Sequence, residues 1–233
     1  MQKLSLSLTF EPRSVHFVSS QQIVVLGDNN IQAISINQIQ LQPQQISQVS
    51  ENIVASTVRG SGIVYATQSG KIYSSGQLQA DIGQQISKVF CVDNQIYFSV
   101  QKSLFQVIDG MPRKLLQADH TIKSMLQSNN KFIVLTTQEL LEFSADFSLL
   151  KTKKSEDQLQ HISGNCIFGL KNVYDFSLQP IMENRNGIAL GDELITREMI
   201  RRTKFSFISG YDKFGRQEAV IDSIQWQLVV FVE

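Results

Sequence analysis

Cysteine, proline and charge are all scarce in this chain. Two cysteines and four prolines occur among 233 residues, and charged residues make up 18%. Two cysteines are too few for a disulfide scaffold, so Cys91 and Cys166 are interpreted as reduced core thiols in a reducing compartment. The 21 acidic residues balance 21 basic ones. This zero net charge provides no overall field to attract nucleic acid or an acidic membrane.

Long apolar runs are missing as well. The sequence contains no continuous apolar stretch of the length that spans a bilayer, about 18 residues or more. Residues 1–10 alternate polar and apolar side chains and lack the continuous apolar segment of a signal peptide. These absences predict an intracellular protein, cytoplasmic or nuclear, for which membrane association is not expected.

The motifs of common catalytic and metal sites are absent too. His16, His120 and His161 have no cysteine or carboxylate at metal-ligand spacing. No phosphate-binding glycine loop and no Gly-x-Ser-x-Gly elbow follows an apolar strand pattern. In propeller glycosidases, an aspartate often recurs at the same position of each repeat. The aspartates of the predicted turns in this chain share no such position. We therefore predict no catalytic residue, no metal and no cofactor, and no small-molecule substrate is evident.

A repeated hairpin organises the chain. Its clearest copy covers residues 62–76, where two short strands flank a turn at Ser69 and Gly70. Weaker copies recur, and the first strands of five hairpins begin near Ile23, Ile63, Ile96, Phe132 and Cys166. A spacing of roughly 33 to 40 residues is typical of propellers and solenoids.

Each copy also has an upstream strand and a variable outer strand, which makes four strands per unit, as in a propeller blade. Helical periodicity is nearly absent, which argues against a helical solenoid. The sequence thus predicts an all-β fold, a single β-propeller domain over residues 1–233 with about six (five to seven) short blades. We expect a charged loop over residues 151–157 between the fourth and fifth copies.

The C-terminal third is less regular. Residues 188–190 and 194–195 predict a hairpin, and residues 204–208 with 216–221, around a turn at 209–213, predict the sixth copy. A short helical insertion is compatible with residues 192–203, with Asp192 as its cap. Apolar alternation at both ends predicts that strands over residues 4–10 and 224–232 lie in the same or adjacent blades and close the ring.

The unit at residues 50–78 resembles a repeat of the RCC1-like propeller family. Gly60 and Gly62 precede the aliphatic strand, a Ser-Gly-Lys turn ends at Lys71, and an aliphatic-aromatic strand closes on Gly76. The family's usual tryptophan before that glycine is replaced by Ser75. This resemblance implies a propeller and, as an alternative function, a regulator that binds a small GTPase or chromatin. A WD-like propeller fits less well, because no Gly-His or Trp-Asp dipeptide occurs.

One dense basic cluster is the candidate partner-binding site. It consists of Arg197, Arg201, Arg202 and Lys204. On a helix, Arg197 and Arg201 would lie one turn apart on one face, suited to an acidic partner, although a solvated face is the simpler interpretation. The motif around Arg201 and Arg202 resembles the Phe-Arg-Arg-Gly signature of phosphoinositide-binding propellers, but both flanking residues differ.

The preferred functional prediction is a non-enzymatic interaction module that acts as a scaffold or subunit of a larger multiprotein assembly. Its predicted partners are other protein subunits, and no strong nucleic-acid signal is present. The 27 glutamines fit this role, because an uncharged amide steers poorly over long distances and suits many short-range contacts. The alternatives are an RCC1-like regulator and a phosphoinositide-binding or membrane-binding propeller.

Overall fold

The computed structural model describes residues 2–19, 21–37, 40–163, 166–183, 188–190, 193–195, 207–211, 218–222 and 227–232. Every regular element in these residues is a β-strand. Five blades of four strands follow one another over residues 14–183, each with its strands in chain order. A sixth four-stranded sheet contains both ends of the chain, and a two-stranded sheet precedes it along the chain. The prediction of an all-β propeller of about six blades is confirmed.

All strands within the five blades are antiparallel to their neighbours. The blades are β2 (Ser14–Ser19), β3 (Gln22–Leu26), β4 (Asn30–Ile36) and β5 (Leu41–Gln48); β6 (Ile53–Arg59), β7 (Gly62–Thr67), β8 (Lys71–Ser74) and β9 (Gln77–Asp81); β10 (Lys88–Val92), β11 (Gln95–Val100), β12 (Ser103–Ile108) and β13 (Met111–Gln117); β14 (Ile122–Ser128), β15 (Lys131–Thr136), β16 (Glu139–Phe143) and β17 (Leu149–Lys154); and β18 (Leu159–Ser163), β19 (Cys166–Gly169), β20 (Asn172–Tyr174) and β21 (Pro180–Glu183). The five predicted hairpins are the second and third strands of these blades.

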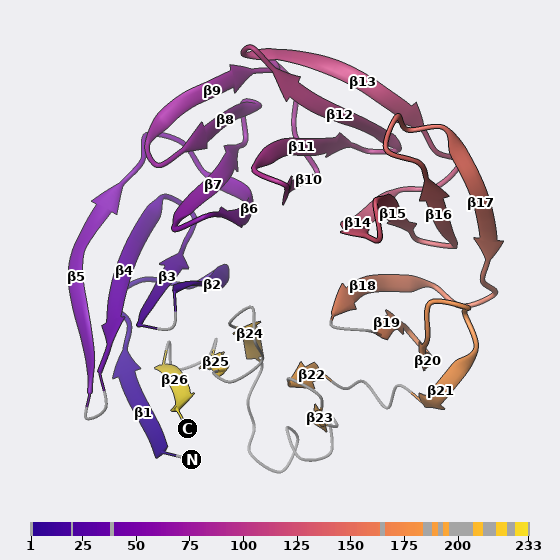
Figure 1. Cartoon of the computed structure of the whole chain (residues 1–233). Helices are drawn as coiled ribbons and strands as arrows, with labels where there is room; N and C mark the ends of the chain where they lie inside the picture. The colour runs from indigo at the N-terminus through magenta and orange to yellow at the C-terminus, as the bar shows by residue number, and fades with distance from the viewer. Residues whose placement is uncertain are drawn as a thin grey trace.

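The sheets stand around a common centre (Figure 1). The first strand of each blade lies nearest the centre and the fourth lies outermost, so we call them the inner and outer strands. Inner strands of neighbouring blades contact each other, as β10 does with β6 and with β14. The outer strands leave one backbone edge unpaired at the wall of the ring.

The core lies between neighbouring blades. In β3, Ile23 and Val25 pack toward the closing sheet, whereas Val24 and Leu26 pack against the blade that begins with β6. Because both faces of such a strand are buried, its sequence is a continuous apolar run without alternation. The same arrangement buries Phe98 of β11 and Leu135 of β15 completely. Blade stacking therefore supplies most of the buried apolar surface.

The ring is closed by pairing of the two chain ends, as predicted. β1 (Gln2–Ser7) pairs with β26 (Gln227–Val232), which pairs with β25 (Glu218–Asp222) and then β24 (Phe207–Tyr211). The two termini lie side by side in Figure 1. The first strand is shorter than predicted and ends at Ser7; beyond it, Phe10 stays buried against Gly27, where a Cβ atom would lie 2.6 Å from the Phe10 ring.

Two further sequence predictions are corrected by the structure, and a third is corrected in part. Residues 151–154 belong to β17 and are not a loop, because their backbone pairs with β16 in antiparallel register. Lys153 also forms an ion pair of 3.1 Å with Glu142 of β16. The predicted turn at 209–213 begins inside β24. The predicted helical insertion near 192–203 includes β23 (Glu193–Ile195), which pairs with β22 (Ile188–Leu190); its remaining residues lie outside the described ones.

Candidate interaction surfaces

One end of the ring is formed by the linkers between blades and by the turns between second and third strands. We call it the linker face. At its linkers, Leu159 donates its backbone N–H to the Thr137 carbonyl of the preceding blade at 2.7 Å. Thr137 in turn donates its own N–H to the Thr121 carbonyl at 3.0 Å. These bonds tie successive blades together, so the linker face is a stiff surface made of irregular backbone.

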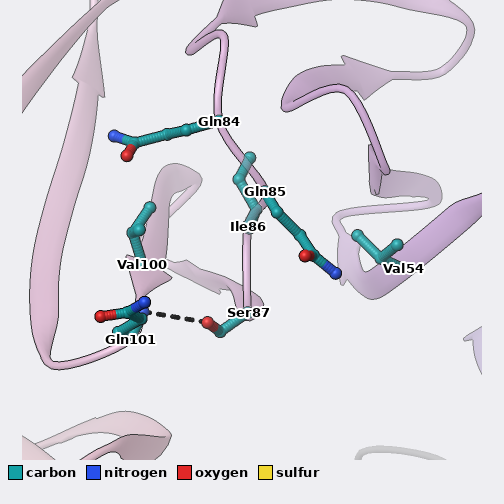
Figure 2. A pocket seen from close by; sticks show the side chains of 7 residues that line it. All are labelled: Val54, Gln84, Gln85, Ile86, Ser87, Val100 and Gln101. Atoms are coloured by element: carbon teal, nitrogen blue, oxygen red, sulfur yellow. Dashed lines mark hydrogen bonds between the residues drawn. The ribbon is translucent and has the colours of Figure 1, made fainter.

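A recess opens on this face between the blades that begin with β6 and β10 (Figure 2). Its volume is about 440 Å³, and its lining consists of Val54, Gln84, Gln85, Ile86, Ser87, Val100 and Gln101. The Ser87 hydroxyl accepts the backbone N–H of Gln101 at 3.0 Å, which fixes the linker to the turn. The Gln85 side chain extends toward Val54, and that of Gln84 extends away from it (Figure 2).

The linker can line this recess because the turn beneath it contains a glycine. Gly70 has a φ of +93°, and a Cβ atom there would lie 2.2 Å from the Gln84 carbonyl oxygen. Any other residue would therefore meet both a strained backbone and a direct clash with the linker. The Ser-Gly-Lys element that resembles an RCC1-like turn thus has a local packing role.

A second recess of about 440 Å³ occupies the equivalent place on the blade that begins with β6. It is lined by Ser50, Glu51, Asn52, Gln68 and Ser69. The Glu51 carboxylate accepts hydrogen bonds from Lys71 Nζ at 2.6 Å and from the Ser69 hydroxyl. The bond from Lys71 and then that from Ser69 lower the pKa of Glu51 to about 2. The single carboxylate of this recess is therefore held in its charged form.

In the blade that begins with β18, a buried carboxylate takes this place. Asp157, only 5% exposed, accepts the backbone N–H groups of Lys171 at 2.9 Å and Asn172 at 3.0 Å. The Tyr174 hydroxyl donates to the same carboxylate oxygen at 3.0 Å. A Cβ atom at Gly169 would lie 2.3 Å from that oxygen. Asp157 is therefore a structural clamp between linker and turn.

The recess chemistry favours binding over proton transfer. The first recess has no carboxylate, imidazole, thiol or amine in its lining, and the one carboxylate of the second is engaged by Lys71. The side-chain amides of Gln84, Gln85 and Gln101 have no hydrogen-bond partner within the described part of the chain. Each amide offers two donors and one acceptor oxygen. Such groups match the polar backbone of an extended peptide. No group of three metal-ligating side chains lies together among the described residues.

The wall of the ring carries a second distinctive surface. Among the described residues, five of the six exposed large hydrophobic side chains occupy the first or second position of an outer strand, in four consecutive blades. We call this set the outer apolar band: Leu78, Met111, Leu149, Leu150 and Ile181. Met111 is 71% exposed and Leu149 is 58% exposed. The sixth, Leu170, lies on the linker face.

The predicted basic site falls outside this description. Arg197, Arg201, Arg202 and Lys204 all lie outside the described residues, and the site stays a prediction. The other basic cluster, Lys151, Lys153 and Lys154, is placed on β17 beside the outer apolar band. Lys153 is neutralised by Glu142, whereas Lys151 and Lys154 are exposed.

The recesses were missed because linker and turn are far apart in the sequence. One signal was available: each linker ends in a buried aliphatic residue, at Ile53, Ile86, Ile122 and Leu159. The residue two places earlier is polar in every case. Aligning the copies on this aliphatic position would have located the linkers. Both cysteines, interpreted as thiols, are free, and burial raises the pKa of Cys91.

No protein-family model matches this sequence, and no curated protein is found to be similar to it. Solved structures do match. The WD40 β-propeller domain of Doa1 superimposes with a TM-score of 0.68 at 11% identity, covering 97% of this chain and 93% of that chain. The WD40 domain of Neurospora crassa Pan2 gives 0.67 at 8%, with the same coverage. YCF48 bound to D1 peptide gives 0.63 at 8%, covering 98% and 94%.

At these identities the comparisons establish the β-propeller fold alone. The WD40 propellers are similar in shape although this chain lacks their dipeptides. The RCC1-like resemblance remains confined to residues 50–78, where it corresponds to the blade β6–β9. No helix in the described residues is long and apolar enough to cross a membrane.

Proposed function

We propose that this protein is a non-enzymatic interaction module and serves as a subunit or scaffold of a larger protein assembly. The outer apolar band carries the proposal. Large apolar side chains are exposed at the same level of four consecutive outer strands, each with an unpaired backbone edge. Recurrent exposed apolar surface of this kind marks interaction sites on soluble domains. A partner that covers the wall would bury these side chains and cap the edges.

Two other observations support the proposal. The linker face is stiffened by bonds between blades, and its recesses offer amides without an available acid or base. The described fold is similar to that of YCF48, which has been solved bound to a peptide. The linker face is thus a second surface for a partner, separate from the wall.

Purification of the tagged chain from its native source tests the proposal. We expect the wild-type chain in a stoichiometric complex by size exclusion and native mass spectrometry. The variant Met111→Ser/Leu149→Ser/Leu150→Ser should fold normally, since these side chains are more than half exposed. The amount of partner protein that co-purifies with it should fall at least about tenfold. Leu170→Ser, an equally exposed leucine outside the band, is the matched control and should retain them.

Two results would overturn the proposal. One is a wild-type chain that elutes as a free monomer from native extract, and the other is a band variant that keeps its partners. Recovery of a small GTPase whose binding depends on nucleotide would instead support the RCC1-like alternative. Flotation of the chain with phosphoinositide vesicles would support the lipid alternative.

A further inference from the structure

The inner strands have a strongly one-sided charge. Five basic side chains lie on β2, β6, β10, β14 and β18, and these strands contain no aspartate or glutamate. They are His16, Arg59, Lys88, Lys123 and His161. The chain as a whole has no net charge. Burial lowers the pKa of both histidines, so the charges on these strands at neutral pH are those of Arg59, Lys88 and Lys123, all of them positive.

Lys88, Lys123 and His161 come from consecutive blades and interact electrostatically. Inner strand β14 contacts both β10 and β18. Burial lowers the pKa of Lys88, and the charge of Lys123 lowers it further. Burial also lowers the pKa of His161, and the charge of Lys88 adds to that effect. The Lys88 side chain is nevertheless exposed to solvent, so small solutes can reach it.

Neither lysine is neutralised within the part of the chain that the structure describes. Lys88 and Lys123 have no ion pair or hydrogen bond within the residues the structure describes. Two ammonium groups in electrostatic contact without a counter-ion repel each other, which costs folding free energy. A bound anion of multiple charge would remove this repulsion.

Local geometry adds polar groups to the two cations. Lys123 sits in a β-bulge, between the register pairs Ile122–Thr136 and Ser124–Leu135, and a bulge re-aims its side chain. Lys88 lies directly opposite Ser99 in register. The Ser99 hydroxyl is completely buried and has no hydrogen-bond partner in the described part of the chain. Cross-strand partners share a face of the sheet, so this hydroxyl lies beneath the lysine side chain.

His161 completes the set. Its ring stacks on Phe168 with centroids 4.7 Å apart and an interplanar angle of 5°, which fixes the imidazole plane. Both ring nitrogens remain without a hydrogen-bond partner among the described residues. The cluster thus offers two cations and an imidazole from three blades.

We propose that Lys88, Lys123 and His161 form a binding site for a small molecule that carries phosphate groups. A phosphate group has several strong acceptor oxygens and up to two charges, so one group can accept bonds from both lysines at once. A single carboxylate offers fewer acceptors and one charge. The site is separate from the outer apolar band and does not depend on the proposed assembly role.

Pyrophosphate is the first probe, because it is the smallest ligand with adjacent phosphates. We expect saturable one-to-one binding by calorimetry and a rise in melting temperature that grows with ligand concentration. In Lys88→Gln/Lys123→Gln the affinity should fall at least tenfold. Lys102→Gln, an exposed lysine in the turn between β11 and β12, is the matched control and should bind normally.

A second measurement separates loss of the site from loss of the fold. Without ligand, Lys88→Gln/Lys123→Gln should melt at or above the wild-type temperature, because the unpaired repulsion is gone. Flotation with vesicles containing a phosphatidylinositol phosphate identifies the source of the phosphate. Flotation that requires Lys88 and Lys123 assigns a lipid headgroup, and pyrophosphate binding alone assigns a free metabolite. Absence of both, or binding unchanged in the double variant, would overturn the proposal.

Discussion

Replacing Asp157 tests whether a single buried carboxylate holds a blade linker to its turn. The variant Asp157→Ala removes the acceptor of two backbone N–H groups, from Lys171 and Asn172, and of the Tyr174 hydroxyl. Each buried polar group left without a partner costs roughly 1–3 kcal/mol. The Tyr174 hydroxyl still accepts a hydrogen bond from the Asn172 side chain at 3.2 Å, so this hydroxyl loses only one of its two partners among these residues. We expect Asp157→Ala to lower the free energy of unfolding by about 3–5 kcal/mol.

Two matched variants sharpen this test. Oδ2 of Asp157 makes all three of the short bonds, while Oδ1 has only a contact of 3.2 Å to the Lys171 nitrogen. An asparagine with its oxygen at the Oδ2 position keeps the three bonds. Asp157→Asn should therefore lower the free energy of unfolding by only about 1 kcal/mol. Asp175→Ala also removes a carboxylate that caps two backbone N–H groups, from Ser177 and Gln179, but in an exposed turn. Water can replace it there, and the loss should stay below about 1 kcal/mol.

Urea unfolding followed by circular dichroism measures all three variants. The expected order of destabilisation is Asp157→Ala, then Asp157→Asn, with Asp175→Ala close to the wild type. If Asp157→Ala and Asp175→Ala lost equal amounts, burial would not be what makes the clamp important. An Asp157→Asn loss as large as that of alanine would show that charge, and not the acceptor oxygen, matters.

Two further predictions concern acid stability and ring closure. Burial lowers the pKa of His16 to about 4 in the folded protein, whereas its pKa in the unfolded chain is near 6.5. As the pH falls, the unfolded chain therefore takes up a proton at His16 before the folded protein does. Stability is then complete above about pH 6.5 and falls by up to about 3 kcal/mol as the pH drops to 4; urea unfolding of His16→Gln should show a shallower dependence than the wild type. Removal of residues 224–233 deletes β26, which lies between β1 and β25, and should abolish cooperative thermal unfolding. Removal of residues 2–7 deletes only the outermost strand of that sheet and should lower the melting temperature with cooperativity retained; equal behaviour of the two truncations would contradict the closure argument.

The parts of the fold that could be predicted are those buried on both faces. Strands such as β7 and β11 read as continuous apolar runs because neighbouring blades cover each side. Their spacing along the chain gave the repeat, and apolar alternation at the ends gave closure. The charged sequence of residues 151–157 predicts a loop, but residues 151–154 belong to the outer strand β17. An outer strand has one unpaired edge and one exposed face, so it needs no apolar pattern.

The sites were less accessible to sequence reasoning, because they combine residues from different repeats. Lys88 and Lys123 each look like an isolated surface lysine until the inner strands β10 and β14 are placed side by side. Likewise, Gln84 and Gln101 line one recess only because the linker crosses the turn of its own blade. Net charge was misleading in the same way, since a balanced total concealed inner strands that hold only basic groups.

The recesses lie where the blades depart from their own common pattern. Two places before the buried aliphatic residue that ends each linker stand Glu51, Gln84, His120 and Asp157. Asp157 reaches the turn and closes the gap, and Glu51 turns to Lys71 and leaves a shallow recess. Gln84 makes neither bond, so Ser87 holds the turn and the space between them stays open. The shared positions of the repeat build the ring, and this variable position decides which of these blades leaves a recess open on the linker face.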